Sequence, residues 1–316
     1  MTTPQLSLVI PIHDEQDNIA LLLAELRDVL AQTGESYEIL LVDDGSLDAS
    51  WEVIQRAASS DAAVTGLRLS RNFGKESALA AGIEHARGAA VIVMDADLQH
   101  PPALIPQMVE IWRSGRAQVV EARKARPVMA APGQRWAARC FYALFGRLSG
   151  FDMPDATDFK LLDRRVVEAW LGLRERGLFF RGMAAWLGFT RVQLPFAVSE
   201  RRHGSSRWSL LRLIGLALTA LTAFSAAPLR LITFAGGLFA LFSLGLGVQT
   251  LYRKLAGSAV DGFTTVILLQ LITGSLIMLG LGIIGEYLAR IYDETKARPR
   301  YIVQDLARRP AAPDPQ

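Results

Sequence analysis

Short apolar runs alternate with longer segments of mixed polarity through the first two hundred positions of the chain. Each run is rich in Val, Leu and Ile, as in strands that are buried on both faces of a parallel sheet. The segments between them repeat apolar residues at the spacing of an amphipathic helix. The predicted strands are 6–12, 37–44, 64–70, 89–97, 118–123 and 189–196, and the predicted helices are 17–32, 75–85 and one from Ser50. This rhythm predicts an α/β domain with a mostly parallel sheet.

The strand signal weakens in the second half of this domain. Residues 126–150 form a basic segment with prolines and glycines, which we interpret as a mobile loop that leads to a helix around 135–145. Residues 157–170 then predict a short strand followed by a helix, and the domain ends near Glu200.

Two later segments are almost free of charge. Leu231 to Tyr252 and Phe263 to Gly285 each exceed twenty residues, which at about 1.5 Å per residue is enough to cross a hydrocarbon core of roughly 30 Å. They raise the mean hydropathy of the chain to +0.23. Basic residues are frequent before the first segment and after the second, whereas the turn holds only Arg253 and Lys254. The positive-inside bias therefore places both ends in the cytoplasm; buried helices of a large soluble domain are the alternative.

Residues 205–224 are apolar on one side and basic near their start, which favours a juxtamembrane amphipathic helix that lies in the membrane interface. The predicted organisation is a catalytic domain at 1–200, juxtamembrane helices at 201–228, two transmembrane helices at 229–287 and a cytoplasmic C-terminal tail at 288–316. The expected location is the inner membrane.

Composition excludes several other classes. The formal net charge is only +3, and no basic run is interleaved with aromatic residues, so nucleic acid is not an expected partner. A single cysteine, Cys140, excludes an internal disulfide and a zinc site of several cysteines. No basic segment followed by an apolar run opens the chain as a signal peptide would.

The stretch VIVMDADLQHPP, from Val91 to Pro102, ends a predicted buried strand with two carboxylates. Asp95 and Asp97 are two residues apart, so their side chains can converge on one point beyond the sheet. Like charges repel unless a cation lies between them or one is protonated. Mg²⁺ or Mn²⁺ takes oxygen ligands and shares its shell with substrate phosphates, so the pair predicts a metal that holds a diphosphate.

Asp43 and Asp44 end an earlier strand on the same predicted edge. In an open parallel sheet the carboxyl edge is where ligands bind. A carboxylate there can accept hydrogen bonds from a base or ribose, whereas Asp48 or Ser46 can cap the next helix. We therefore interpret Asp44 as a nucleotide-binding residue.

Five ordered motifs, VIPIHDEQDNI, LLVDDGSLDAS, RNFGKESALAAGIEHARG, VIVMDADLQHPP and TDFKLLDRRVV, give the chain a family resemblance over nearly its whole length. It resembles the family 2 glycosyltransferases of the GT-A fold, a Rossmann-like architecture. Within them it is similar to the polyprenyl-phosphate glycosyltransferases, and its two C-terminal spans are typical of the bactoprenol glucosyltransferase subgroup.

The resemblance implies a nucleotide-sugar donor, a divalent metal on Asp95 and Asp97, and a polyprenyl phosphate acceptor. Asp158 matches the position of the catalytic base, and Asp97 is expected to act through the metal. The residues expected around the nucleotide sugar are Pro11, Asp14, Glu15, Asp43, Asp44, Lys75, Asp95, Ala96 and Arg123. Closure of Arg123 and Arg126 over the diphosphate and a solvated basic loop are equally good interpretations.

A basic cluster before the first span matches a family motif that usually contains lysine. Arg201, Ser206 and Arg207 are expected to bind the lipid phosphate. Arg207 replaces the lysine, so a flat guanidinium stands where the family has a point charge.

The expected function is inverting transfer of a sugar, with glucose from UDP-glucose favoured by analogy, to undecaprenyl or another polyprenyl phosphate at the cytoplasmic face. The donor could instead be UDP-aminoarabinose, UDP-GlcNAc or GDP-mannose. A processive polysaccharide synthase and a lipid scaffold without activity are less favoured functions. A nicotinamide dehydrogenase would need a glycine-rich turn after the first strand, which PIHDEQDN lacks. Glycines in the spans would permit close helix packing in a homo-oligomer such as a tetramer.

Overall fold

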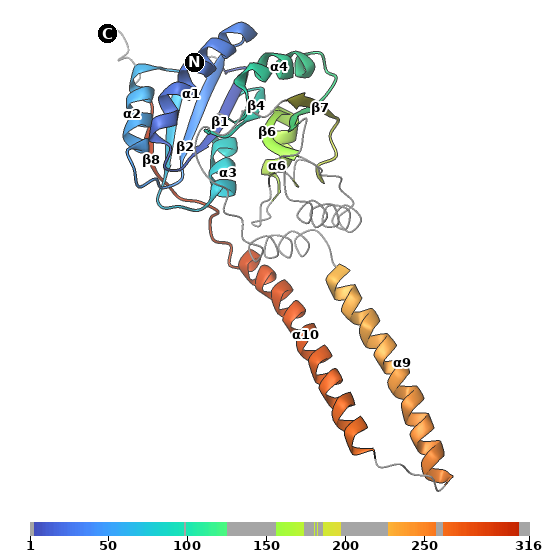
Figure 1. Ribbon diagram of the computed structural model, residues 1–316. Coiled ribbons are helices and arrows are strands. Elements are labelled where there is room, and N and C mark those ends of the chain that lie inside the picture. Colours follow the sequence, from blue (N-terminus) through green and yellow to red (C-terminus); the bar gives the residue numbers. More distant parts are fainter. Residues whose placement is uncertain are drawn as a thin grey trace. The chain divides into compact units, whose positions relative to one another are not determined.

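The computed structural model describes residues 3–97, 99–124, 156–173, 180, 182, 186–196, 227–256 and 262–309. The chain divides into two compact units (Figure 1). The first comprises residues 1–146, 151–206 and 298–316, and the second comprises 147–150 and 207–297. The helices predicted around 135–145 and 205–224 lie outside the described residues.

The first unit is built on a mixed sheet whose eight described strands run in the order β7-β5-β6-β4-β1-β2-β3-β8. Their bounds are β1 Leu6–Ile12, β2 Tyr37–Asp43, β3 Val64–Leu69, β4 Ala90–Val93, β5 Val119–Lys124, β6 Ala156–Asp163, β7 Arg191–Phe196 and β8 Val303–Ala307. Strands β4, β1, β2 and β3 are parallel neighbours, and β7 is parallel to β5. The predicted mostly parallel sheet is therefore confirmed, with β6 and β8 as antiparallel members.

Strand β1 lies at the point where the strand order reverses, between β2 and β4. Leu6 is in register with Tyr37 on one side and with Ala90 on the other. Strand β4 ends at Val93, so the predicted strand 89–97 is too long, and Asp95 and Asp97 lie in the loop after it. This loop and the loops after β1, β2 and β3 meet at one edge of the sheet, where such a reversal commonly forms a ligand site.

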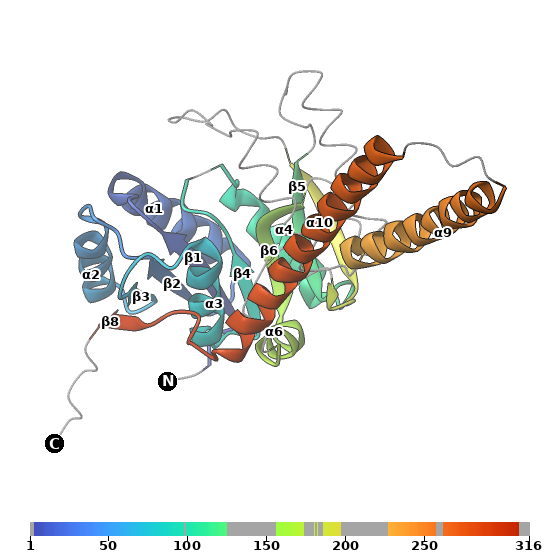
Figure 2. The ribbon, with the colours of Figure 1, turned by 90° about the horizontal axis from the view of Figure 1, so that it is seen from below.

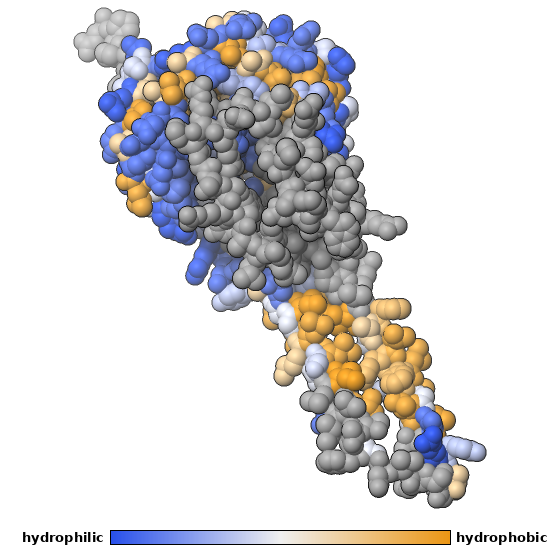
Figure 3. Space-filling view, in the orientation of Figure 1, coloured by the Kyte–Doolittle hydropathy of each residue, from blue (hydrophilic) through white to orange (hydrophobic). Residues whose placement is uncertain are grey.

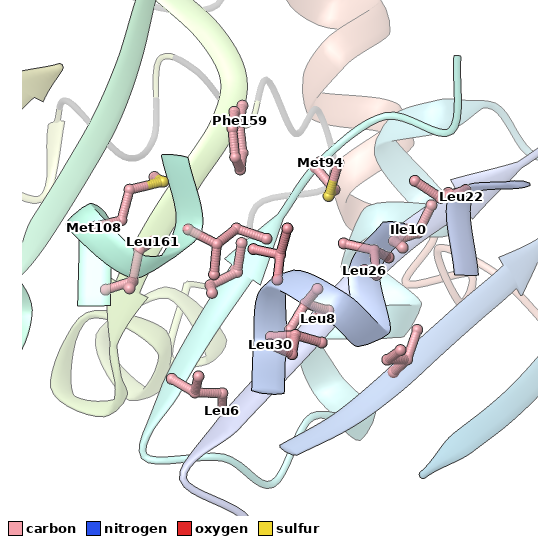
Figure 4. Close-up of a cluster of buried hydrophobic side chains, with 14 of the residues drawn as sticks. Leu6, Leu8, Ile10, Leu22, Leu26, Leu30, Met94, Met108, Phe159 and Leu161 are labelled. Atoms are coloured by element: carbon pink, nitrogen blue, oxygen red, sulfur yellow. The ribbon is translucent and has the colours of Figure 1, made fainter. Parts of the chain in front are cut away.

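Helices cover both faces of the sheet (Figures 1 and 2). Leu8 and Ile10 of β1 face the same core as residues of α1, α2 and α4, and Figure 4 shows Leu22, Leu26 and Leu30 of α1 among them. The described helices are α1 Gln16–Thr33, α2 Ser50–Ser60, α3 Lys75–His85, α4 Ile105–Arg113 and α6 Arg164–Leu171, and a 3-10 turn, η1, spans Pro102–Leu104.

Helix α3 packs on the opposite face, against Val9, because neighbouring strand residues point to opposite sides. A β-carbon on Gly82 would lie 2.2 Å from Cγ1 of Val9, so glycine is what lets this helix approach the sheet. The close approach fixes the position of the α3 axis on the sheet, so its first residue, Lys75, lies at the carboxyl edge of β1.

The second unit is a helical hairpin of α9 Ala227–Leu255 and α10 Phe263–Thr295. Both helices are long and apolar enough to cross a membrane, over 232–253 and 272–295, and almost none of their described residues are buried. Large apolar side chains therefore face outward, and much of the described hairpin surface is hydrophobic in Figure 3. Such a surface suits lipid better than water.

The region 288–316, predicted as a tail, contains the end of α10 and the strand β8. Strand β8 is antiparallel to β3, with Leu306 opposite Leu67, and it supplies one edge of the described sheet. The Tyr301 hydroxyl donates to the carboxylate of Glu84 at the end of α3. Burial, together with this carboxylate, raises the pKa of Tyr301, so the hydroxyl stays protonated as a donor.

Candidate functional site

A cavity of about 330 Å³ opens at the carboxyl edge of the parallel strands. Its walls come from the loops after β1, β2, β3 and β4 and from the first turn of α3. The lining residues are Pro11, Ile12, His13, Glu15, Asp44, Asn72, Gly74, Lys75, Asp95, Ala96 and Asp97.

Asp44 ties the loop after β2 to the loop after β3. Its Oδ1 accepts a hydrogen bond from the Phe73 amide at 2.7 Å, and its Oδ2 accepts one from the Gly74 amide at 2.9 Å. Burial raises the pKa of Asp44, and the two amide hydrogen bonds oppose this effect. The carboxylate thus holds one wall of the cavity in place while it also lines the cavity.

The same two loops touch at Gly45. This residue has φ of +67°, and a β-carbon there would lie 2.5 Å from the carbonyl carbon of Arg71. Glycine satisfies both requirements, since it adopts positive φ readily and has no side chain. The packing of these two loops therefore explains the glycine after Asp44 without any contact with a ligand.

Two predicted nucleotide-binding carboxylates, Asp14 and Asp43, are not among the residues that line the cavity. Asp14, with φ of +55°, accepts a hydrogen bond from the Leu47 amide at 2.9 Å. Asp43 is 0% exposed and accepts one from the Ser46 amide at 3.0 Å. Both residues accept hydrogen bonds from amides of the loop after β2, and these contacts hold that loop in place.

A single ammonium joins the two parts of the predicted catalytic centre. Nζ of Lys75 lies 2.5 Å from Oδ1 of Asp95 and 2.6 Å from Oδ2 of Asp158. Asp158 reaches this position because β6 runs antiparallel to β4, with Lys160 opposite Val93, so the start of β6 adjoins the end of β4. Asp158 is only 4% exposed.

The charge on Lys75 is stabilised by its two partners. Burial alone would lower the pKa of Lys75, but the carboxylates of Asp95 and Asp158 outweigh it and raise the pKa above its usual value. The group is therefore an ammonium at neutral pH, and it balances one of the two negative charges beside it.

Asp95 and Asp97 both line the cavity and suit a hard divalent cation. Oδ1 of Asp97 accepts a hydrogen bond from the Gln99 amide at 3.1 Å, and the residue is exposed. Within the described parts of the chain, no group of three or more His, Cys, Asp or Glu side chains is arranged to hold a metal. Two carboxylates fit Mg²⁺ or Mn²⁺, because these ions keep waters and substrate phosphates as their other ligands.

Seven of the residues predicted around the donor or the metal line the cavity: Pro11, Glu15, Asp44, Lys75, Asp95, Ala96 and Asp97. Asp158 reaches it through Lys75. Arg123 instead lies on β5, where its Nη1 donates to Gln193 of β7 at 3.2 Å. Arg126, Arg201, Ser206 and Arg207 lie outside the described residues.

Four further lining residues were given no role in the site from the sequence, namely Ile12, His13, Asn72 and Gly74. His13 and Asn72 carry the signal that identified Asp44, because each is a polar residue just after a predicted strand. In the structure the side-chain nitrogen Nδ2 of Asn72 lies 3.0 Å from Nε2 of His13. These two side chains join the loops after β1 and β3 at the mouth of the cavity.

Comparison with known proteins gives a consistent result. The sequence model of glycosyl transferase family 2 matches residues 7–170. The chain is 39% identical to an uncharacterized glycosyltransferase of Synechocystis over 96% of both proteins. It is 36% identical to the bactoprenol glucosyl transferase of Shigella phage SfX, over 95% of this chain and 99% of that protein.

Among solved structures, mannosyl-3-phosphoglycerate synthase from Rubrobacter xylanophilus superposes with a TM-score of 0.48 at 21% identity. The match covers 70% of this chain and 72% of the other.

Proposed function

Because the chain belongs to glycosyl transferase family 2, we propose that it transfers one sugar from a nucleotide sugar to a polyprenyl phosphate in a membrane. The observation that carries this proposal is the cavity that Asp95, Asp97 and Lys75 line, with Lys75 paired to both Asp95 and Asp158. Relatives of nearly the same length named bactoprenol glucosyl transferase support the acceptor. The same names favour glucose, with UDP-glucose as its donor.

The charge of the cavity favours a donor that arrives with a metal. Four carboxylates line it, those of Glu15, Asp44, Asp95 and Asp97, against the ammonium of Lys75. A nucleoside diphosphate is itself an anion, so this wall would repel it without a cation. Mg²⁺ or Mn²⁺ held by Asp95 and Asp97 would supply that charge and stabilise the departing diphosphate.

The nucleoside is expected at the opposite end of the cavity from the metal. Pro11 lies in β1, Glu15 follows β1, and Asp44 follows β2, on the side of β1 away from β4. Both oxygens of Asp44 already accept amide hydrogen bonds. Each carboxylate oxygen has two lone pairs, so a ribose hydroxyl or base N–H can still donate to Asp44.

The proposed reaction is a direct displacement. An oxygen of the lipid phosphate forms a bond to the anomeric carbon while the bond from that carbon to the nucleoside diphosphate breaks, and the configuration inverts. A phosphate monoester has a second pKa near 6, so the acceptor needs little deprotonation at neutral pH. Asp158 therefore orients the acceptor and takes any residual proton, and Lys75 offsets the repulsion between Asp158 and the phosphate.

The helical hairpin would bring the enzyme to the membrane that contains its lipid acceptor. Two helices able to span a bilayer would anchor the catalytic domain to the inner membrane, where polyprenyl phosphates reside. With both termini in the cytoplasm, the cavity meets soluble nucleotide sugars on the same side. Arg201, Ser206 and Arg207, which precede α9 in the chain, would bind the lipid phosphate.

The decisive experiment incubates the purified full chain with undecaprenyl phosphate, Mn²⁺ or Mg²⁺, and one labelled donor at a time. The donors are UDP-glucose, UDP-GlcNAc, UDP-aminoarabinose and GDP-mannose. We expect a lipid product with one sugar, formed from UDP-glucose and abolished by chelator. A polymer would instead indicate a processive synthase, and absence of product with every donor would overturn the proposal.

The carboxylates provide a matched pair of variants for the same assay. Asp97→Asn removes a proposed metal ligand and should lower turnover by about a hundredfold or more, within the range typical for loss of a transition-state charge contact. Asp28→Asn removes an exposed carboxylate on α1, away from the cavity, and should leave turnover unchanged. Equal activity of the two variants would show that the metal lies elsewhere.

A further inference from the structure

The Lys75 ammonium contacts the Asp95 oxygen that a bound metal would need as a ligand. Its Nζ lies 2.5 Å from Oδ1 of Asp95. The other oxygen, Oδ2, lies 3.8 Å from Nδ1 of His100, a residue that is only 5% exposed and therefore faces the protein interior. Oδ1 is thus the Asp95 oxygen directed toward the cavity, and Lys75 already contacts it.

A divalent cation and the Lys75 ammonium cannot share this oxygen without strong repulsion. A bound Mg²⁺ lies about 2.0–2.1 Å from its oxygen ligands. Positive charges at such short range repel, and solvent screens this repulsion only in part, because the Lys75 side chain is 40% exposed and the Asp95 side chain is 23% exposed. Lys75 has a second partner in Asp158 at 2.6 Å, so its side chain can leave Asp95 and remain paired.

We propose that Lys75 is a positioning residue that holds Asp95 and Asp158 together before the metal binds, and that the metal displaces it from Asp95 toward Asp158 and the acceptor phosphate. This inference rests on the proposed function, since it takes Asp95 and Asp97 as the metal ligands. It adds a role for the Lys75 ammonium, which links metal binding at Asp95 to the charge beside Asp158.

The link between the two sites follows from the local charges. Before the metal binds, one ammonium is divided between two carboxylates, and a phosphate dianion that approaches Asp158 meets a net negative site. After displacement, the full charge of Lys75 lies beside Asp158 and the phosphate. Coupling of this kind is reciprocal, so the acceptor also strengthens metal binding.

Removal of the ammonium tests the first half of the proposal without any turnover. Lys75→Gln leaves Asp95 without this cation, so the variant should unfold at a lower temperature than the wild type in metal-free buffer. Mn²⁺ without nucleotide should then raise the unfolding temperature of the variant more than that of the wild type. Paramagnetic resonance of free Mn²⁺ should show binding to the variant that is about fivefold tighter or more, the low end of typical coupling between ligands.

Arg87 gives a matched control. It pairs with the buried carboxylate of Glu38 at 2.7 Å, outside the cavity. Arg87→Gln should also lower the unfolding temperature, but Mn²⁺ should stabilise it no more than it stabilises the wild type. Equal stabilisation of the Lys75 variant, the Arg87 variant and the wild type by Mn²⁺ would refute displacement at Asp95.

The second half is tested by kinetics. Lys75→Gln should raise the KM for polyprenyl phosphate and leave the KM for the nucleotide sugar nearly unchanged. Lys75→Arg keeps the charge and should restore most of the acceptor KM, even where Lys75→Gln is poorly folded. An increase confined to the donor KM would contradict the proposal and would assign Lys75 to the diphosphate.

These results separate the inference from the proposed function. If no donor yields a product, the function fails, while the Mn²⁺ experiments still decide whether Lys75 competes with a cation. If a glycolipid forms but Mn²⁺ affects wild type and Lys75→Gln alike, the function stands and the role of Lys75 is wrong.

Discussion

Gly45 and Gly34 form a natural pair for measuring how tightly the loops beneath the cavity pack. Both have φ of +67°. A β-carbon on Gly34 would meet no atom within 4 Å, whereas one on Gly45 would lie 2.5 Å from the Arg71 carbonyl carbon and 2.6 Å from the Asn72 amide nitrogen. Backbone strain is therefore common to both alanine variants, and the steric clash belongs to Gly45→Ala alone.

The two effects differ in size. A non-glycine residue in the left-handed region costs about 1.5 kcal/mol, which is our expectation for Gly34→Ala. Forcing an additional carbon into packed backbone adds about 2 kcal/mol, so Gly45→Ala should cost about 3.5 kcal/mol. For a domain of this size 1 kcal/mol corresponds to about 3 °C, so the melting temperature should fall by about 5 °C and about 10 °C respectively.

Thermal unfolding of the full chain in detergent, followed by circular dichroism, measures both changes. Asn72 and Gly74 line the cavity, so Gly45→Ala should also weaken binding of the nucleotide sugar, which Gly34→Ala should leave intact. Equal decreases in melting temperature would mean that the loops after β2 and β3 separate easily, and close packing at Gly45 would then be refuted.

Three further predictions concern stability and use the same melting assay. Although burial raises it, the hydrogen bonds that Asp163 accepts lower its pKa, so this carboxylate stabilises the fold above about pH 4 and the contribution is lost as pH falls. The melting temperature of Asp163→Asn should accordingly lie below that of the wild type at pH 7 and approach it near pH 3; a constant difference would exclude the linkage. Lys160 is 0% exposed and pairs with Glu121 at 2.5 Å. Lys160→Met leaves the Glu121 charge buried without this partner and should lower the free energy of unfolding by roughly 4 kcal/mol, and the double variant with Glu121→Leu should recover most of this stability. A double variant as unstable as Lys160→Met would contradict the assignment of the loss to a buried charge. Tyr301→Phe removes the hydrogen bond to Glu84 and should cost about 1 kcal/mol or about 3 °C; an unchanged melting temperature would show that this contact does not hold the C-terminal strand.

Local sequence patterns predicted those helices and strands whose formation depends mainly on the residues within them. The apolar run 6–12 predicts β1 at Leu6–Ile12, and the helical pattern of 75–85 predicts α3 at Lys75–His85, both as observed. Helix α4 at Ile105–Arg113 is not among the predicted helices, because a double proline before it is typical of a stop. Proline also favours the first turn of a helix, and here Pro102 begins the turn that leads into α4.

These local patterns could not predict contacts between residues that are far apart in the sequence. The polar residues after each parallel strand predicted most of the cavity, because parallel strands end at one edge. The bridge from Lys75 to Asp158 joins residues 83 positions apart, and it exists because β6 runs antiparallel to β4. An apolar run predicts a strand but not its direction or its neighbour, so this contact could not be derived from spacing.

Strand β8 shows the same limit and also changes the interpretation of the C-terminal region. Two of its five residues, VQDLA, are polar and three are exposed, so the local pattern does not mark a strand and pairing with β3 is what makes it one. Without β8, strand β3 would present unpaired amide and carbonyl groups along an open edge, a site for unwanted pairing with other chains. The chain leaves α10 at Thr295 and joins this edge at Val303, so the last strand both completes the catalytic sheet and ties it to the hairpin by a connection of only a few residues.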